Sequence, residues 1–398
     1  MKKYKNNIIL DYIQLGLRSF NVTNVIWLLY LLLKGFDPLE IGIFESVFHV
    51  SSLLFEIPSG MLADLIGRKQ SRIIGVLLYL VYVILIVYGN NVVLIGLAFI
   101  FCGASYAFES GSGEALIYDS LVMTNDQDKF MKINGNREII FQLSSTLALL
   151  IGGYLALMSY KLNFLVVFIA FTVALIPVLL MKETKQNSVK KHSNFNDLVY
   201  EHFVRSTKTV FNDKNLTFLI ILGALLAAPV TSIFFYFQLY LSESLNYPEY
   251  LIGILLAVHS LAGALGGYLA SRLEKKFQEK LLLYIVPLLL VVSFWAIQVD
   301  LIVFVPFVLL GFLDSLLYIV LSDYVNRIIP SEQRATVLSF SSFAFSIVMI
   351  IIFPILGAIA KYSSYKISFL ILAGLVSVLY VALLLVLRSN KFVVKKGQ

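Results

Sequence analysis

Long apolar runs recur along the whole chain, and they constrain the fold more than any other feature. Stretches such as GVLLYLVYVILIVYG (75–89) and FLILAGLVSVLYVALLLVL (369–387) are, with their flanks, long enough to cross a hydrocarbon core about 30 Å thick. Hydrophobic residues make up 59% of the sequence and charged residues only 14%, whereas a soluble protein carries about a quarter charged residues. The sequence therefore predicts a polytopic helical membrane protein.

Twelve hydrophobic segments are expected to span the membrane. They cover residues 8–33, 39–62, 70–89, 92–118, 136–157, 162–181, 215–241, 249–271, 280–299, 301–326, 335–359 and 366–387. A long polar stretch separates the sixth segment from the seventh. We therefore predict an all-α membrane protein with twelve transmembrane helices in two six-helix bundles, residues 1–182 and 215–398, joined by a cytoplasmic linker at 183–214.

The distribution of positive charge predicts the orientation. With the N-terminus in the cytoplasm, 26 of the 31 Lys and Arg residues fall in or beside the cytoplasmic loops and tails. The exceptions are Lys34, Lys161, Lys361 and Lys366 outside and Arg18 within the first segment. By the positive-inside rule, both termini are cytoplasmic in a multi-pass protein of the cytoplasmic membrane. The net charge of +7 is then a topology signal, and nucleic acid is not an expected partner.

The two halves of the chain resemble each other. SGMLADLIGRK (59–69) ends the second segment, and GGYLASRLEKK (266–276) ends the eighth, at the matching place in the second half. The six-helix bundles are therefore expected to be pseudo-symmetric. Such a doubled unit is typical of transporters, because two similar halves can rock about a site between them.

The first of these loops resembles the signature loop of the major facilitator superfamily. That pattern reads Gly, any residue, Leu, a small residue, Asp, a basic residue, any residue, Gly and two basic residues. The matching positions are Gly60, Leu62, Ala63, Asp64, Gly67, Arg68 and Lys69, while Leu65 replaces the first basic residue. The resemblance covers essentially the whole chain. Within the superfamily, the chain is similar to the bacterial drug-efflux members. It implies the fold of that superfamily.

The resemblance implies that this loop is a latch on the cytoplasmic side. Gly60 would let the second helix approach a neighbour closely, and Gly67 would supply the freedom for a sharp turn. Asp64 would meet the positive end of the eleventh helix, near PSEQRATV. Arg68 and Lys69 would stay in the cytoplasm and hold the orientation. A merely topogenic basic loop would explain these two cations but not Asp64.

Four ionisable residues are predicted at membrane depth, where each costs about 2.5–3.5 kcal/mol. Arg18 lies in the first segment, Glu109 and Glu114 in the fourth and Asp314 in the tenth. The resemblance places these helices around a central cavity. Glu109 and Glu114 are about 140° apart on a helix, so one is expected to face the cavity and the other the second or fifth helix, toward Arg137.

Two interpretations of these charges remain open. In the structural one, buried ion pairs hold the halves together and Arg18 neutralises one acid. In the functional one, at least one acid titrates, because Arg18 offers one positive charge against three carboxylates. An unpaired carboxylate at this depth accepts a proton readily. That property suits proton coupling, the binding of a cationic substrate, or competition between the two.

Secondary candidates lie nearer the helix ends or stand alone. Glu56 precedes Gly60 by one turn and is assigned to the latch region. Asp119 and Asp323 occupy matching places in the two halves and are expected to form gate or helix-end contacts. His259 is a lone imidazole in an apolar helix, and we interpret it as a core histidine in preference to a proton relay.

The predicted function is secondary active transport of a small molecule, by a monomer that rocks two bundles. Proton-coupled efflux of an amphipathic or cationic compound is our first hypothesis. Proton symport or uniport of a metabolite is the alternative, because Ala148 and Leu149 stand where drug–proton antiporters carry Gly-Pro in the fifth helix. A non-transporting sensor or scaffold is a third. The sequence contains no nucleotide-binding loop or nucleophile constellation, and its single cysteine excludes a cysteine-based metal site, so neither an enzyme nor a cofactor is expected.

Overall fold

The computed structural model describes residues 2–184, 214–277, 279–328 and 334–388. Within these ranges all regular secondary structure is helical, which confirms the predicted all-α class. Ten helices of the described part are long and apolar enough to cross a membrane, and Leu281–Ala296 forms a shorter apolar helix. The first expected span is divided between two helices.

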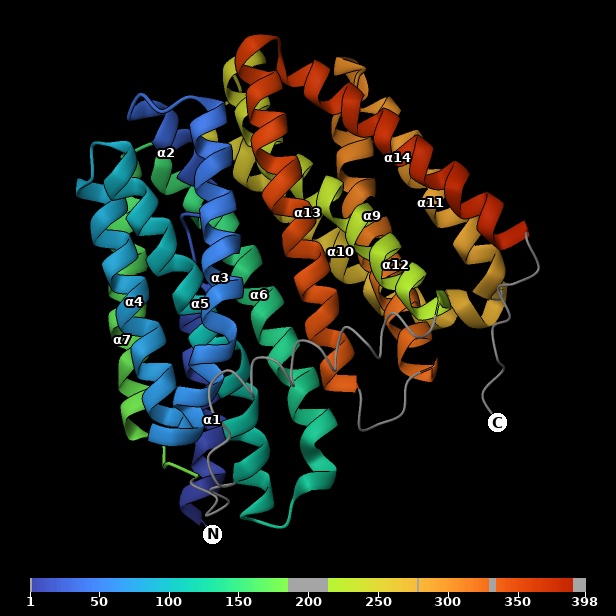
Figure 1. Ribbon diagram of the computed structural model, residues 1–398. Helices are drawn as coiled ribbons and strands as arrows, with labels where there is room; N and C mark the ends of the chain where they lie inside the picture. The colour runs from blue at the N-terminus through green and yellow to red at the C-terminus, as the bar shows by residue number, and fades with distance from the viewer. Residues whose placement is uncertain (1, 185–213, 278, 329–333, 389–398) are drawn as a thin grey trace. The chain divides into compact units, whose positions relative to one another are not determined.

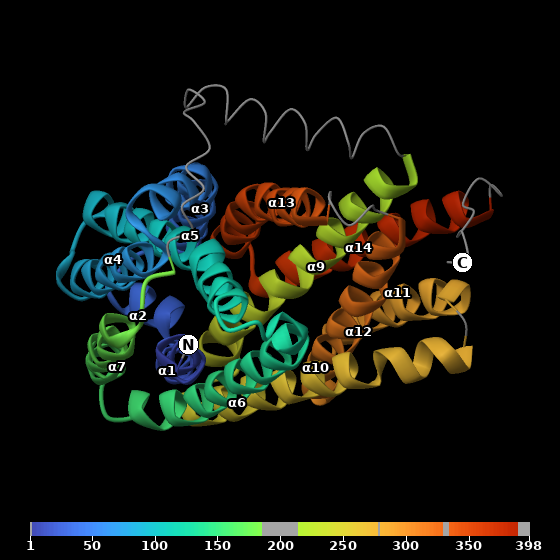
Figure 2. The ribbon, with the colours of Figure 1, turned by 90° about the horizontal axis from the view of Figure 1, so that it is seen from below.

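The described residues form two compact units. Unit 1 comprises Met1–His192 with Leu245–Ala257, and unit 2 comprises Ser193–Ser244 with Val258–Gln398. The main helices of unit 1 are α1 (Lys2–Ser19), α2 (Trp27–Leu33), α3 (Pro38–Ile66), α4 (Arg68–Tyr88), α5 (Val92–Val122), α6 (Phe130–Ala156) and α7 (Tyr160–Leu180). Figure 1 shows α3, α4 and α5 side by side, and in Figure 2 α1 lies among α5, α6 and α7.

Unit 2 contains the remaining helices. They are α9 (Lys214–Leu239), most of α10 (Glu249–Phe277), α11 (Glu279–Ala296), α12 (Phe304–Ile328), α13 (Arg334–Tyr362) and α14 (Tyr365–Arg388). Helix α9 contacts α12, α13 and α14. The rings of Phe237 and Phe307 stack at 4.3 Å in the core of this unit, and Phe369 lies beside Phe237. Helices α10 and α12 approach closely, since a Cβ at Gly266 would overlap the carbonyl oxygen of Phe312.

The first span is broken, where a single helix over 8–33 was expected. Helix α1 ends at Ser19 and α2 begins at Trp27. Between them, Oδ1 of Asn21 accepts hydrogen bonds from the backbone N–H of Thr23 at 3.2 Å and from its hydroxyl at 2.6 Å. Short polar side chains compete in this way with helical hydrogen bonds. A local polar pair therefore interrupts the span, although the segment contains no proline.

The break is buried in protein, as irregular backbone at membrane depth requires. Asn163 of α7 donates to the carbonyl of Val22 at 2.9 Å, and Asn21 donates to the hydroxyl of Tyr79 on α4 at 2.7 Å. A Cβ at Gly152 of α6 would overlap the Val22 carbonyl oxygen. Gly152 is therefore needed at this position because the unwound chain packs directly on its backbone.

Candidate functional site

Five charged side chains and one glutamine from four helices of unit 1 meet in one group, which we call the charge cluster. Its members are Asp11, Gln14 and Arg18 on α1, Arg72 on α4, Glu109 on α5 and Arg137 on α6. Residues three and four apart share a face of a helix. The spacing of the three α1 members therefore turns them toward the same neighbours.

Arg72 is the centre of the charge cluster and is fully buried. Its Nη1 donates to Oδ1 of Asp11 at 2.8 Å, and its Nη2 donates to Oε1 of Gln14 at 2.6 Å. Oε1 of Glu109 accepts from Nη2 at 2.8 Å and from Nε at 3.1 Å. A guanidinium without water is tolerated only with such partners, because burying an unpaired charge is strongly unfavourable.

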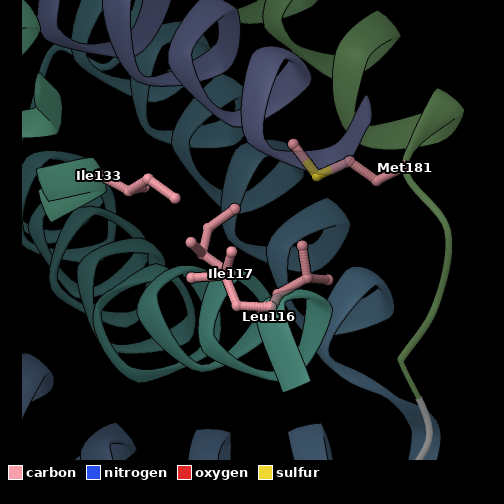
Figure 3. Packing of buried hydrophobic residues seen from close by; sticks show 5 residues of the cluster. Leu116, Ile117, Ile133 and Met181 are labelled. Carbon is pink, nitrogen blue, oxygen red and sulfur yellow. The ribbon is translucent and has the colours of Figure 1, made fainter. Parts of the chain in front are cut away.

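An apolar layer closes one side of the charge cluster. The buried side chains of Leu116, Ile117, Leu121, Ile133 and Met181 form a core group. Figure 3 shows those from α5, α6 and the end of α7 pointing toward one another. Met181 joins this layer to the charges, because its sulfur lies 3.6 Å from Nη1 of Arg72. Since the layer excludes water, the charge interactions beside it are strengthened.

The charge count in unit 1 differs from the one expected. Nε of Arg137 lies 2.9 Å from Oδ2 of Asp11, so three guanidinium groups face two carboxylates. The sequence assigned Arg72 and Arg137 to the charges of the cytoplasmic loops and left Arg18 alone against the acids. Within the charge cluster that surplus of acid is absent, whereas Glu45 and Glu114 of unit 1 lie outside the cluster. The charge cluster instead carries one excess positive charge.

Glu109 and Glu114 lie on different faces of α5. Glu109 is 5% exposed and turns toward α4, where it pairs with Arg72. It was expected to face either the cavity or the second or fifth span. Glu114 is exposed, and its Oε1 accepts from the amide of Asn134 at 3.2 Å. Ser110 and Tyr118, one turn to either side of Glu114, are exposed as well. Glu109 is therefore neutralised within the bundle, and Glu114 belongs to a face that unit 1 leaves uncovered.

The signature loop is held by Glu183, which was not among the candidate residues. The carboxylate of Glu183, just beyond α7, accepts from the backbone N–H groups of Arg68 and Lys69 at 3.0 Å each. These are the first residues of α4, so the acid caps the positive end of the helix. Lys69 returns the contact by donating from Nζ to the Leu179 carbonyl at 2.6 Å. The loop is therefore fastened to the end of the sixth span.

Gly67 is the residue that this capping requires. Its φ of +113° and ψ of 154° belong to a region that is essentially restricted to glycine, and a Cβ there would overlap the Glu183 carboxylate. We expect Gly67→Ala to lower the free energy of unfolding by about 1–3 kcal/mol, measured by thermal unfolding in detergent. Gly60→Ala is the matched control, because no described atom lies within 4 Å of a Cβ at Gly60. Equal stability of the two variants would argue against the cap.

The other loop residues lie apart from the charge cluster. Asp64 has a side chain 70% exposed, 3.3 Å from Nη2 of Arg68, and Nε of Arg68 lies 3.7 Å from Asp119. Glu56 is exposed on α3. The expected partner of Asp64 is the stretch PSEQRATV (330–337), of which residues 330–333 lie outside the described residues.

The close helix contact expected at Gly60 is not formed among the described residues. The close approach to α3 occurs instead at Gly103 of α5, where a Cβ would overlap the Phe48 carbonyl oxygen. The tight crossing therefore lies farther from the loop than expected, because the small residue that permits it belongs to the neighbouring helix.

The three candidate residues of unit 2 do not form a cluster like that of unit 1. Asp314 is half-buried on α12, and its carboxylate makes no hydrogen bond or ion pair with any described residue. His259 is buried, with Nδ1 2.8 Å from the Phe307 carbonyl oxygen and its ring beside those of Phe234 and Phe307. Asp323 is half-buried farther along α12. Asp314 is therefore distinguished from the paired acids of unit 1.

Several residues of these sites were not selected from the sequence. Asp11 and Arg72 each lie near the start of an expected span, where a charge is ordinarily solvated, and their pairing joins positions far apart in the chain. Glu45 and His49 form a further buried pair on α3, with Oε1 and Nε2 3.6 Å apart. Their spacing of four residues in an apolar helix was a signal that could have identified this pair.

Comparisons with known proteins agree with this architecture. The model of the family described as Major Facilitator Superfamily matches residues 13–303. The uncharacterized MFS-type transporter YxaM of Bacillus subtilis (strain 168) is 25% identical over 366 residues, which cover 89% of each chain. An uncharacterized transporter of Buchnera aphidicola subsp. Schizaphis graminum (strain Sg) is 27% identical over 226 residues, or 53% of this chain and 54% of the relative.

Solved structures of transporters share the fold. The crystal structure of the nucleoside transporter NupG has a TM-score of 0.74 at 15% identity and covers 97% of this chain and 99% of its own. A bacterial homologue of the lysosomal transporter Spinster, inward-facing and unoccupied, has a TM-score of 0.75 at 14% identity, covering 98% of each chain. A POT family transporter in complex with 5-aminolevulinic acid has a TM-score of 0.71 at 14% identity, covering 99% and 97%. The predicted fold class is confirmed by these likenesses.

Proposed function

Because the chain belongs to the major facilitator superfamily, and is therefore a secondary transporter in a membrane and not an enzyme, we propose that it couples the movement of a small amphipathic molecule to protons. The proposed direction is efflux across the cytoplasmic membrane, in keeping with the resemblance of the chain to the bacterial drug-efflux members. The transporting unit is proposed to be one chain, with two bundles that rock about a central site.

The observation that best supports proton coupling is that Asp314 has no described partner. A carboxylate at membrane depth is unfavourable when ionised and unpaired, so it favours the protonated form. Asp314 is half-buried in a spanning helix without a described partner. It can therefore gain and lose a proton without breaking an ion pair. Glu114 is the second candidate, because it is exposed on α5 beside a single amide partner.

Glu109 is the least suitable of the three acids as a proton carrier. Its Oε1 accepts two hydrogen bonds from Arg72, a fully buried guanidinium. Protonation of Glu109 would leave part of that charge without compensation. We therefore assign Glu109 a structural role and place the proton on Asp314 or Glu114.

A cationic substrate is also compatible with the sequence. That possibility depended on a surplus of acids over Arg18, and the charge cluster has the opposite balance. We therefore propose an amphipathic compound without requiring a positive charge. Import of a metabolite by proton symport or by uniport is the second candidate function. It is favoured by Ala148 and Leu149, which replace the Gly-Pro of drug–proton antiporters.

Both termini and the loop between the sixth and seventh spans are proposed to be cytoplasmic. Labelling of intact cells with a membrane-impermeant thiol reagent tests this topology. We expect a cysteine placed at position 190 to stay unmodified, while Asn90→Cys, in the exposed turn between α4 and α5, reacts. The native Cys102 is buried and does not interfere. The reverse pattern would invert the topology.

The signature loop is proposed to close the cytoplasmic side during transport. Asp64 is largely exposed, so Asp64→Asn should change the free energy of unfolding by less than about 1 kcal/mol. We expect this variant to be produced normally but to transport at a severely reduced rate, because the latch has lost its charge. Asp128→Asn, an exposed acid in the loop between α5 and α6, is the matched control. Wild-type turnover in Asp64→Asn would remove the latch role.

A transport screen in everted vesicles tests the proposed function. In these vesicles an exporter carries the compound into the lumen, and respiration makes the lumen acidic. We expect a library of amphipathic compounds to include at least one that accumulates only with the gradient and is released by a protonophore. Vesicles without the protein are the control. Gradient-independent equilibration would contradict coupling, and accumulation only in right-side-out vesicles would support the import alternative.

A further inference from the structure

Arg18 is the member of the charge cluster whose side chain makes no hydrogen bond to any described residue, whereas the other members each make at least one. Its Nη1 lies 3.6 Å from Oε1 of Glu109, which is an ion-pair distance, and no described atom accepts a hydrogen bond from it. The same Glu109 oxygen already accepts twice from Arg72. A guanidinium carries five N–H donors in a planar fork that fits carboxylate and phosphate groups. Arg18 therefore has a full set of donors available for another anion.

The other cations of unit 1 that lie near apolar surroundings are satisfied differently. Arg72 donates to Asp11, Gln14 and Glu109. Lys34 donates from Nζ to the carbonyls of Ile86, Val87 and Gly89 at 2.7, 2.9 and 2.6 Å. The open donors of Arg18 are therefore not a general property of the cations in this unit.

An aromatic ring lies against Arg18. Its guanidinium carbon is 5.2 Å from the ring centre of Tyr106 on α5, and Phe48 of α3 holds that ring from the side at 5.3 Å. The Arg18 side chain is 19% exposed and Tyr106 is 44% exposed. An apolar body can contact the ring while its acidic group is held by the guanidinium. This combination of a fork and a ring fits an amphipathic anion.

The acids near this place do not occupy the guanidinium. Glu45 of α3 lies on the buried side and is paired with His49. Glu114 follows Tyr106 by eight residues on α5, which is about 12 Å along a helix. Asp11 is held by Arg72 and Arg137. The excess positive charge of the charge cluster is therefore located at its open edge.

A structural explanation for Arg18 also exists. It lies in the last turn of α1, where a cation is favoured by the helix dipole, and α1 ends there because the span is broken. That explanation accounts for the charge but not for the open donors or for the exposed ring. It also predicts that lysine would serve equally well and that no ligand would depend on Arg18.

Resting on the proposed function, we propose that Arg18 and Tyr106 form the subsite for an acidic group of the transported compound. The substrate class is then a small organic anion, a carboxylate or phosphate with an apolar body. The guanidinium binds the acidic group by two parallel hydrogen bonds, and the apolar body covers the ring of Tyr106.

Binding to the full-length protein in nanodiscs of neutral phosphatidylcholine tests this inference without turnover or a gradient. The probes are matched sets in which each aromatic or aliphatic body carries a carboxylate, a phosphate, a neutral amide or an amine, starting with 1-naphthylacetate, 1-naphthyl phosphate, 1-naphthylacetamide and 1-naphthylmethylamine. Dissociation constants come from the concentration dependence of thermal stabilisation. We expect the carboxylates and phosphates, and not their neutral or cationic partners, to stabilise the wild type.

Variants assign the effect to the subsite. Arg18→Gln leaves Glu109 paired with Arg72, so the protein should fold, and we expect the anions to bind about 10- to 100-fold more weakly. Tyr106→Leu should weaken binding, whereas Tyr106→Phe keeps the ring and should bind normally. Arg272→Gln is the matched control, because Arg272 also lies over a tyrosine, Tyr268, at 4.8 Å, but uses a donor on its hydroxyl.

The outcomes separate the possibilities. Stabilisation by amines or amides that persists in Arg18→Gln, or no stabilisation by any anion, would overturn the subsite. Equal binding by Arg18→Lys would contradict the fork geometry. Competition by added phosphatidylglycerol would keep the anion site and assign its occupant to a lipid headgroup. A gradient-driven cationic substrate would overturn this inference while leaving proton-coupled transport intact.

Discussion

Arg72→Leu is expected to lower the free energy of unfolding by about 3–5 kcal/mol, the largest stability effect of any change considered for this protein. The reason is that Asp11 and Glu109 would lose their shared partner while they remain buried. Thermal unfolding in detergent, together with the yield of folded protein, measures the effect. The loss should appear whether or not a substrate is present, because the cluster belongs to the bundle itself.

A neighbour on the same helix provides the matched control. Arg68 lies one turn before Arg72, and its ion pairs of 3.3 and 3.7 Å are partly exposed. Arg68→Leu should cost less than about 1 kcal/mol. Adding Asp11→Asn and Glu109→Gln to Arg72→Leu should restore part of the stability, because the stranded charges are then removed. If Arg72→Leu and Arg68→Leu were equally stable, the cluster would not hold unit 1 together.

Asp314→Asn should abolish gradient-driven transport while leaving thermal stability close to that of the wild type. The carboxylate has no described partner, so its neutralisation strands no charge. Exchange of substrate at equal pH should persist, because exchange needs alternating access but no net proton movement. Driven accumulation in everted vesicles is expected to fall at least tenfold, toward the passive level. A tenfold fall corresponds to about 1.4 kcal/mol of lost coupling free energy.

Control acids make this prediction specific. Asp300 lies outside the spanning segments, and hydrogen bonds from Lys366 and Tyr240 hold the pKa of its carboxyl below the usual value. It stays ionised at any working pH and cannot carry a proton, so Asp300→Asn should remain coupled. Glu114→Gln should impair coupling only if the second candidate carries the proton. Glu109→Gln should lower stability and yield together with transport.

Much of the fold could be predicted because it depends on local and cumulative properties of the sequence. Apolar runs such as residues 75–89 indicate membrane-spanning helices, and the polar stretch after the sixth segment separates the two halves of the chain. The break in the first span was missed because it depends on the side chain of Asn21 bonding to Thr23 and Tyr79. A hydropathy pattern does not register a hydrogen bond between two moderately polar residues and a tyrosine 58 positions away.

The candidate site was harder to predict than the fold. Arg72 follows a basic loop by three residues, so its charge looked topogenic, yet it is fully buried. Its partners lie on α1 and α5, 61 and 37 positions away. Glu183 similarly caps α4 from the end of α7, 115 positions from Arg68. Tertiary pairing of this kind determines which charges are neutralised, and no single segment contains that information.

Proton movement linked to substrate movement is the most direct test of the account. Purified protein is reconstituted in liposomes that contain a pH-sensitive dye, and a substrate found in the vesicle screen is added on one side. We predict that the substrate gradient changes the lumenal pH with the wild type and with Asp300→Asn, but not with Asp314→Asn. Substrate flux through the wild type without any change in lumenal pH would contradict proton coupling.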